Sequence, residues 1–195
     1  MTQNWTISKQ FEFCYGHRVH NQTLNAELSL DSCLACRHFH GHQGTVLVSL
    51  SATELTNGMV TDFKHLGWFK KWLDEVLDHK MILDINDPIV PISFPILKSL
   101  KPEETATIGS LLDFNETENY YLVWPDLYEN LPTHETEIYE GLILVPFVPT
   151  SENLSKWLWE IVNKKMGHLC KVSQVQFYET PKSQSVYTNV WKLTI

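Results

Sequence analysis

Ten consecutive residues hold much of the metal-binding potential of this sequence. The stretch from Cys33 to His42 contains two thiols and three imidazoles, out of four Cys and nine His in the chain. Thiolate sulfur and neutral imidazole nitrogen are both good zinc ligands. Because alternate side chains of an extended strand point the same way, His40 and His42 can reach one ion together. Gly41 between them removes a side chain where the backbone would pass close to that ion.

The same stretch allows two kinds of zinc site. Four protein ligands make a structural zinc, and Cys33, Cys36 and two histidines would close such a Cys₂His₂ site in a binding or assembly module. Three ligands with an open position make a catalytic zinc. The third histidine would then be His17, which ends a row of alternating aromatic residues. A single histidine there would more often be a core residue, but beside His40 and His42 it is a candidate ligand.

Hydrophobic periodicity predicts the elements that position these residues. Residues 7–19 alternate between apolar and polar types, as in a half-buried strand, and a second strand begins at His40. Asp62 is a suitable N-cap for an amphipathic helix that runs to about residue 77. Asp78 and His79 close that helix.

A second amphipathic helix and two further strands follow near the end of the chain. The helix has Thr150 as its N-cap and matches the i, i+3, i+4, i+7, i+8 template, ending before Gly167. Strands are predicted at about 169–179 and 184–195, where Tyr187, Asn189, Trp191 and Leu193 alternate with other residues. The expected fold is α+β, a four-stranded antiparallel sheet with two helices on one face, in the order β-β-α-(insert)-α-β-β.

The segment 84–148 differs from the rest in charge and composition. It contains seven of the nine prolines. Between Asp87 and Glu140, eleven acidic residues accompany only two lysines, which leaves twelve acidic and thirteen basic residues elsewhere. We interpret residues 84–148 as an acidic insertion, either a small β-excursion or a long flap, within a single domain that spans residues 1–195.

Composition excludes several classes of protein. The net charge of −8, without a basic stripe, argues against a nucleic-acid partner. No apolar run approaches 18 residues and no signal pattern opens the chain, so we expect a soluble, cytoplasmic protein with no membrane partner. Two of the four Cys lie in a His cluster, which indicates metal binding or catalysis rather than disulfides.

Six motifs occur in an order that resembles a known family. They are an aromatic strand ending in His17, Cys36-x-x-x-His40-Gly-His42, Gly58-Met-Val-Thr-Asp62-Phe63, Leu77-Asp78-His79, Pro149-Thr-Ser-Glu-Asn153 and Tyr178-Glu179-Thr180. Together they resemble the 6-pyruvoyl-tetrahydropterin synthase and 6-carboxytetrahydropterin synthase family. The resemblance covers about residues 5–83 and 147–195, and it leaves the insertion outside.

The resemblance implies a tunnelling fold (T-fold) and a homo-oligomer. Three such sheets close into a twelve-stranded barrel, and two trimers stack into a hexamer with active sites between subunits. The family's site residues are then carried over position by position. Zinc (Zn²⁺) is held by His17, His40 and His42; Cys36 accepts a proton and Asp78 and His79 assist its transfer; Glu179 holds the pterin, which the backbone at Thr150 and Ser151 also contacts.

The implied activity is that of a pterin lyase with a small-molecule substrate. Cys36 stands four residues before His40, the short spacing of the bacterial carboxy-type enzyme. That enzyme converts 7,8-dihydroneopterin triphosphate to 6-carboxytetrahydropterin with loss of triphosphate and acetaldehyde, for queuosine synthesis. The alternative is the pyruvoyl-type synthase or a related pterin lyase. Four basic residues near the motifs either meet the triphosphate or are exposed, solvated side chains: Arg18, His20, Arg37 and Lys80.

Overall fold

The structure is a computed structural model that describes residues 4–188. Its contacts divide the chain into two compact units, and each is described by itself. Among the described residues, the first unit comprises 4–14, 42–78 and 151–188, and the second comprises 15–41 and 79–150. The strands β1 (Trp5–His17) and β2 (His40–Ala52) each have residues in both units.

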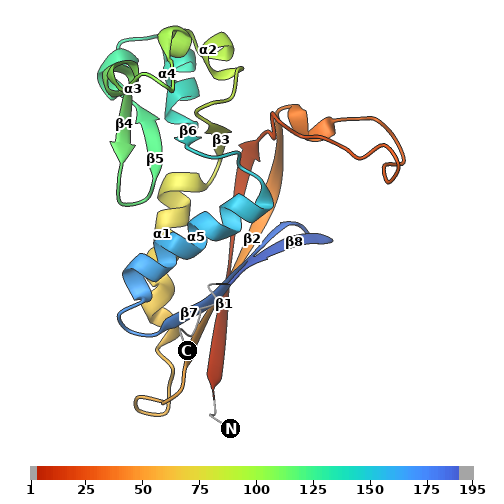
Figure 1. Cartoon of the computed structure of the whole chain (residues 1–195). Coiled ribbons are helices and arrows are strands. Elements are labelled where there is room, and N and C mark those ends of the chain that lie inside the picture. Colours follow the sequence, from red (N-terminus) through yellow and green to blue (C-terminus); the bar gives the residue numbers. More distant parts are fainter. Residues whose placement is uncertain (1–3, 189–195) are drawn as a thin grey trace. The chain divides into compact units, whose positions relative to one another are not determined.

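The first unit joins an antiparallel ladder to a long amphipathic helix. β2 pairs with β7 (Lys171–Thr180), and β7 pairs with β8 (Ser183–Tyr187). The helix α5 (Ser151–Met166) packs on β7 and β8 (Figure 1). The apolar positions predicted to face the core are all buried: Leu154, Trp157, Leu158, Ile161 and Val162. The second predicted helix is therefore confirmed.

The first predicted helix is present but consists of three kinds of turn. A 3₁₀ helix (Phe63–Leu66) leads into α1 (Gly67–Trp72), and a π-helix (Leu73–Leu77) follows. The Asp62 side chain accepts a hydrogen bond from the Lys64 backbone N–H, which confirms the predicted N-cap. The segment packs on α5 through the indole rings of Trp72 and Trp157, whose centroids lie 5.9 Å apart.

The second unit contains parallel strands that periodicity did not predict. β3 (Lys80–Asp84) pairs in parallel with the end of β1 and with β6 (Leu142–Val145). β4 (Leu112–Asn115) and β5 (Tyr120–Val123) form an antiparallel pair, and β5 adjoins β6. The expected class, α+β, holds, but the expectation of a four-stranded antiparallel sheet is wrong because residues 80–145 add strands and make the pairing mixed. Parallel neighbours need a long crossover, and the insertion provides one between β3 and β6.

Residues 84–148 form a packed body rather than an open flap. They contain three short α-helices, α2 (Val90–Ser93), α3 (Thr105–Leu111) and α4 (Thr133–Glu140), and two 3₁₀ helices, Pro95–Ser99 and Pro125–Leu127. Their apolar side chains surround a core that includes Leu83, Phe94, Leu97, Tyr139 and Leu144. Strands were expected here and are present; the helices were missed because each spans only four to eight residues.

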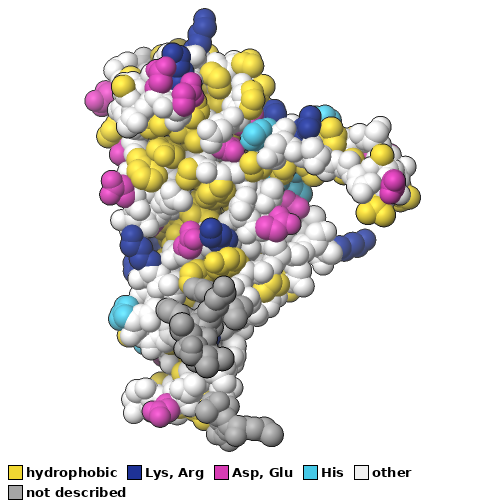
Figure 2. Space-filling view, in the orientation of Figure 1, with side chains coloured by type: hydrophobic (Ala, Val, Ile, Leu, Met, Phe, Trp, Pro, Cys, Tyr) yellow, Lys and Arg dark blue, Asp and Glu magenta, His cyan; other side chains and the backbone are white. Residues whose placement is uncertain are grey.

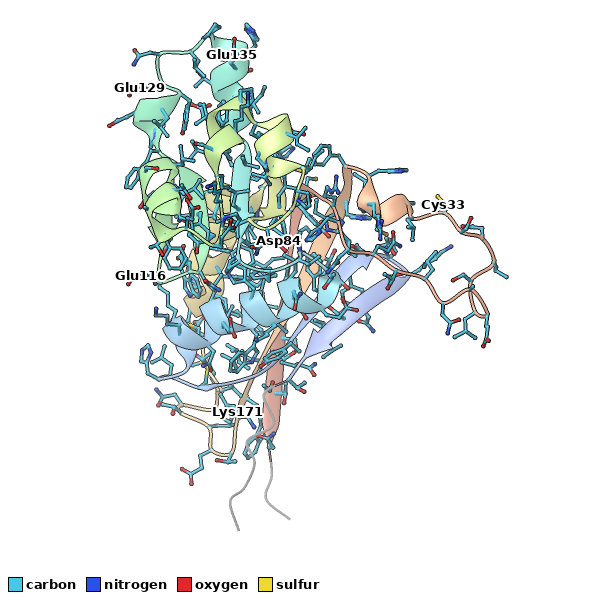
Figure 3. The ribbon with its side chains drawn as sticks, turned by 45° about the horizontal axis from the view of Figure 1, so that its top comes forward. Cys33, Asp84, Glu116, Glu129, Glu135 and Lys171 are labelled. Atoms are coloured by element: carbon cyan, nitrogen blue, oxygen red, sulfur yellow. The ribbon has the colours of Figure 1, made fainter. Side chains whose placement is uncertain are left out.

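The acidic side chains of the insertion mostly face solvent. Glu116, Glu129 and Glu135 are exposed and point outward from the second unit (Figure 3). Figure 2 shows acidic side chains at the surface. Asp84 and Asp87 are the exceptions, with exposed fractions of 4% and 1%. Most of the negative charge is therefore a solvated surface, whereas these two carboxylates lie in the interior.

The last predicted strand and the expected lack of a membrane-spanning helix can be compared with the described residues. The last strand is described as far as Tyr187, so the predicted alternation at Asn189, Trp191 and Leu193 lies outside the described residues. Within residues 4–188, no helix has both the length and the apolar character needed to cross a membrane.

Candidate functional site

Two histidines from different strands meet at one point in the second unit. His17, at the end of β1, has an exposed fraction of 0%. Its Nε2 atom lies 3.0 Å from Nε2 of His40, the first residue of β2. Each ring also has a backbone carbonyl at its other nitrogen. Nδ1 of His17 lies 2.7 Å from the Pro149 oxygen, and Nδ1 of His40 lies 2.9 Å from the His38 oxygen.

These contacts determine where each imidazole carries its proton. A carbonyl oxygen can only accept, so the Nδ1 atoms of His17 and His40 are the protonated ones. In the neutral rings, both Nε2 atoms then present lone pairs to each other at 3.0 Å. Such a pair requires a positive charge between or beside the two nitrogens, from a metal ion or from an additional proton. Donation of Nδ1–H to a carbonyl is also how proteins orient histidines that bind metals.

His42 completes a group of three imidazoles. It lies two residues after His40 in β2, and one ring nitrogen from each of His17, His40 and His42 lies within 4.8 Å of the others. Its Nε2 atom is also 3.7 Å from Oε1 of Glu179, on β7. Three neutral nitrogen donors suit zinc with one coordination position left for a substrate atom. The residues present therefore fit the metal that the sequence predicts.

Gly41 has a role in the packing of two strands. The Cβ atom of any larger residue at this position would lie 2.9 Å from the Tyr15 carbonyl oxygen. The glycine therefore permits close approach of the β1 backbone, whereas the sequence suggested close approach to the ion. Its effect is to hold the strand ends that carry His17 and His40 near each other.

The two cysteines of the starting stretch are not part of the three-histidine group. Cys33 is exposed on the loop between β1 and β2 (Figure 3). Cys36 lies in a short 3₁₀ helix, Ala35–Arg37, where its N–H donates to Gln22 Oε1 and its carbonyl accepts from Val19 N–H. Within residues 4–188, the donor set at the histidines contains no thiol, unlike the Cys₂His₂ alternative.

Sequence reasoning missed Cys14 as a neighbour of Asp78. The Cys14 backbone N–H donates to Asp78 Oδ1 at 2.7 Å. Potential ligand atoms of Cys14, Asp78 and His79 lie within 4.8 Å of one another, and Cys36 is absent from that group in the described part of the chain. The available signal was the alternation of β1, which assigns Cys14 to the polar face of the strand. Its pairing with Asp78, 64 residues away, left no local pattern.

His79 has an unusual backbone conformation. Its φ angle is +60°, in the left-handed region that residues other than glycine seldom adopt. This conformation occurs between Asp78, which caps the π-helix, and the first residue of β3, so it turns the chain between two elements. Such backbone conformations are concentrated at functional sites. The His79 side chain is exposed.

Cys170 is a poor candidate for a reactive thiol. It is buried, with an exposed fraction of 8%, next to the start of β7. Burial raises the pKa of the Cys170 thiol above its usual value because the thiolate is poorly solvated there. At neutral pH it therefore remains a protonated core side chain.

The residues expected to contact the pterin lie at the start of α5 and the end of β7. The Thr150 N–H donates to the Val148 carbonyl, and the Ser151 carbonyl accepts from the Ser185 hydroxyl at 2.6 Å. Glu179 retains an exposed side-chain fraction of 26%. A carboxylate with this exposure can accept hydrogen bonds from a ligand. Its Oε1 atom also lies 3.7 Å from His42 Nε2.

The four cations proposed to meet a triphosphate are all engaged within the second unit. Arg18 Nε lies 2.9 Å from Asp87 Oδ2, and His20 Nε2 lies 3.1 Å from Asp84 Oδ2. The Arg37 guanidinium donates to the Gln22 carbonyl, and Lys80 Nζ donates to the Glu140 carbonyl. These contacts give Arg18 and His20 a structural partner in place of the expected anion.

Comparisons with known sequences agree on the family. A profile of the family described as 6-pyruvoyl tetrahydropterin synthase matches residues 6–190, a match that spans the insertion. The 6-carboxy-5,6,7,8-tetrahydropterin synthase of Aquifex aeolicus (strain VF5) is 28% identical over 194 residues, 94% of this chain and 97% of that protein. The protein of the same name from Rickettsia conorii is 32% identical over 84 residues, 41% of this chain and 52% of that protein.

Comparisons of structure confirm the expected fold. An uncharacterized protein from Wolinella succinogenes is 46% identical with a TM-score of 0.88, covering 96% of this chain and 99% of that chain. The 6-pyruvoyl tetrahydropterin synthase of Caenorhabditis elegans has a TM-score of 0.53 at 18% identity, covering 97% and 98%. The fold is therefore the T-fold, with more strands than the sequence predicted. Since the family profile spans nearly the whole sequence, the chain belongs to the 6-pyruvoyl tetrahydropterin synthase family.

Proposed function

We propose that this protein is a zinc-dependent 6-carboxytetrahydropterin synthase that acts in the cytoplasm as a homo-oligomer. Its substrates would be 7,8-dihydroneopterin triphosphate and water, which supplies the second carboxyl oxygen, and its other products triphosphate and acetaldehyde. The observation that carries the metal part is the approach of the His17 and His40 Nε2 atoms to 3.0 Å, with both Nδ1 atoms donating to carbonyls. The name of the Aquifex relative and the Cys36–His40 spacing support the carboxy-type reaction.

His17, His40 and His42 would hold the zinc ion, with Nδ1–H of the first two fixed on carbonyl oxygens so that their rings keep one orientation. When bound, the ion supplies Lewis acidity to the hydroxyl groups of the substrate side chain.

Cys36 would accept the carbon-bound proton next to the pterin ring. Two hydrogen bonds of its backbone, with Gln22 and Val19, hold it in space beside the residues that follow His17 at the end of β1. Asp78 and His79 would relay the proton. The hydrogen bond from the Cys14 N–H fixes the Asp78 carboxylate. The His79 ring is exposed, so a substrate at a subunit boundary could reach it.

Glu179 would bind the pterin ring. The 2-amino group and the adjacent ring N–H form a pair of parallel donors, and a carboxylate accepts such a pair with both oxygens. Its position at the end of β7, near His42, would place the ring beside the metal centre.

The test is to incubate the purified, zinc-loaded protein with 7,8-dihydroneopterin triphosphate and to identify the products by mass. We expect 6-carboxytetrahydropterin, triphosphate and acetaldehyde, and loss of turnover after chelation that zinc restores. Formation of 6-pyruvoyl-tetrahydropterin would favour the pyruvoyl-type reaction instead. Absence of any pterin product from a protein that holds zinc would overturn the proposed activity.

A further inference from the structure

The predicted metal ligand His17 lies at one edge of three parallel strands. In the second unit, β1, β3 and β6 run in parallel, with His17 paired to Ile82 and Asp84 paired to Val145. Parallel strands bring their carboxyl ends to the same edge of a sheet, which is where open α/β sheets commonly bind ligands. The edge here consists of the ends of β1 and β3 and the segment that follows β6.

Two buried carboxylates project at this edge. Asp87 Oδ2 pairs with Arg18 Nε at 2.9 Å, and Asp87 Oδ1 accepts the Ile89 N–H. Asp84 Oδ2 pairs with His20 Nε2 at 3.1 Å, and its Oδ1 accepts two bonds from Asn86. Figure 3 shows Asp84 inside the second unit, whereas the labelled glutamates point outward. Both carboxylates belong to the turn that opens the insertion.

The side chains that contact these carboxylates follow His17 closely in the sequence. Arg18 is the next residue, and His20 comes two residues later. At the other end of the insertion, the Pro149 carbonyl accepts the Nδ1–H of His17. The chain that leaves β1 is therefore held by both ends of the insertion. The Arg18–Asp87 ion pair and the His20–Asp84 hydrogen bond hold it at one end, and the hydrogen bond from the His17 imidazole to Pro149 holds it at the other.

We propose that Asp84 and Asp87 are positioning residues for the metal ligand His17. They fix the backbone of β1 at its exit through His20 and Arg18, so that Nε2 of His17 stays at the distance from His40 that a shared ion requires. This inference rests on the proposed zinc site, and it gives the insertion a function as a structural part of that site.

Charge and burial explain why a neutral residue in place of Asp84 or Asp87 would weaken metal binding. Removing the carboxylate charge of Asp87 leaves a guanidinium with an exposed fraction of only 17% without its counter-ion. Breaking one partner of a buried pair is strongly destabilising locally, so the Arg18 side chain would move toward solvent. Groups that orient metal ligands typically change metal affinity by about 10- to 100-fold when they are altered.

The experiment measures zinc affinity by competition with a chelator for the wild type, Asp84→Asn, Asp87→Asn and the control Asp113→Asn. Asp113 is exposed on β4 of the same unit and is not part of the edge. We expect affinity to fall about tenfold or more for the first two variants and to stay unchanged for the control. The visible spectrum of the cobalt-substituted protein should shift in the same two variants, which a general loss of stability would not cause.

The outcomes separate this inference from the proposed function. Wild-type affinity and an unaltered cobalt spectrum in folded Asp84→Asn and Asp87→Asn would overturn the positioning role and leave the zinc site standing. A wild-type protein that binds no zinc would overturn both. If Asp87→Asn does not fold, Arg18→Lys decides, since it keeps the positive charge but loses the guanidinium contact. We expect weaker zinc binding for Arg18→Lys, and unchanged binding would contradict the inference.

Discussion

The tautomers of His17 and His40 are set by two backbone carbonyls that lie far apart along the chain. One belongs to Pro149, 132 residues beyond His17, and the other to His38, two residues before His40. The sequence pattern His-x-His predicted that two ligands share a strand face, but the Pro149 contact has no local signature. Single substitutions test the histidine ligands, the Cys36 thiol and the Glu179 carboxylate one at a time.

Substitution of the ligands tests the metal centre. We expect His17→Ala, His40→Ala and His42→Ala each to abolish stable binding of about one zinc per chain, because two histidines alone bind zinc weakly. The control is His134→Ala, whose side chain is 80% exposed on α4. Zinc content is measured by elemental analysis after gel filtration. Full occupancy in any of the three variants would remove that residue from the ligand set.

Substitution of Cys36 and of Cys14 tests which of the two thiols acts as the general base. We expect Cys36→Ser to lower kcat by about 10²- to 10⁴-fold, the usual contribution of a general base, while zinc content is retained. Cys14→Ser should keep the backbone hydrogen bond from residue 14 to Asp78, and with it most of the activity. Cys33→Ser, on the exposed loop, is the control. A large loss for Cys14→Ser with an active Cys36→Ser would transfer the role of base to Cys14.

Glu179→Gln tests recognition of the pterin. The amide keeps the size of the side chain but replaces one acceptor oxygen by a donor, so a charge-assisted bond is lost. We expect pterin affinity to fall by about 10- to 100-fold, in line with 1.5–3 kcal/mol for hydrogen bonds to charged groups. Binding is followed by titration calorimetry with zinc content as the control. Unchanged affinity would exclude Glu179 from the ring site.

The elements of the first unit were predicted well because each has a strong local period. The helix α5 buries every position that the 3.6-residue template selects, and the part of β1 in this unit buries Phe11 and Phe13 in alternation. The second unit was predicted poorly for the opposite reason. Its helices are too short to show a period, and its parallel pairs join strands that are distant in sequence. Sequence patterns report periodicity within a segment and contain little about partners between segments.

The N-cap of the first helical segment provides a test of this element. Asp62→Ala removes the acceptor of the Lys64 N–H, and we expect the free energy of unfolding to fall by about 1 kcal/mol. Asp62→Asn keeps an oxygen acceptor and should retain most of the stability. Both are compared with the wild type by urea denaturation. Equal stability of the wild type and Asp62→Ala would show that the cap does not contribute to the free energy of unfolding.

The proposed assembly explains why residues with related roles fall in separate groups. Cys36 lies beside the exit of β1, whereas Asp78 and His79 form a group with Cys14 among the described residues. In the T-fold assembly that we propose, active sites lie between subunits, so that one subunit would contribute the thiol and its neighbour the Asp78–His79 pair. The exposed His79 ring is consistent with such sharing.

Mixed oligomers test this arrangement directly. Cys36→Ser and His79→Asn are each expected to be inactive; Asn is chosen because it tolerates the positive φ of residue 79. The two variants are co-expressed in equal amounts and assemble at random into cyclic oligomers. About one quarter of the subunit interfaces then contain both an intact Cys36 and an intact His79. We therefore expect about a quarter of wild-type kcat per site, measured on the co-expressed mixture without selection for its composition. Activity no higher than that of either variant alone would mean that both groups serve a site from the same subunit.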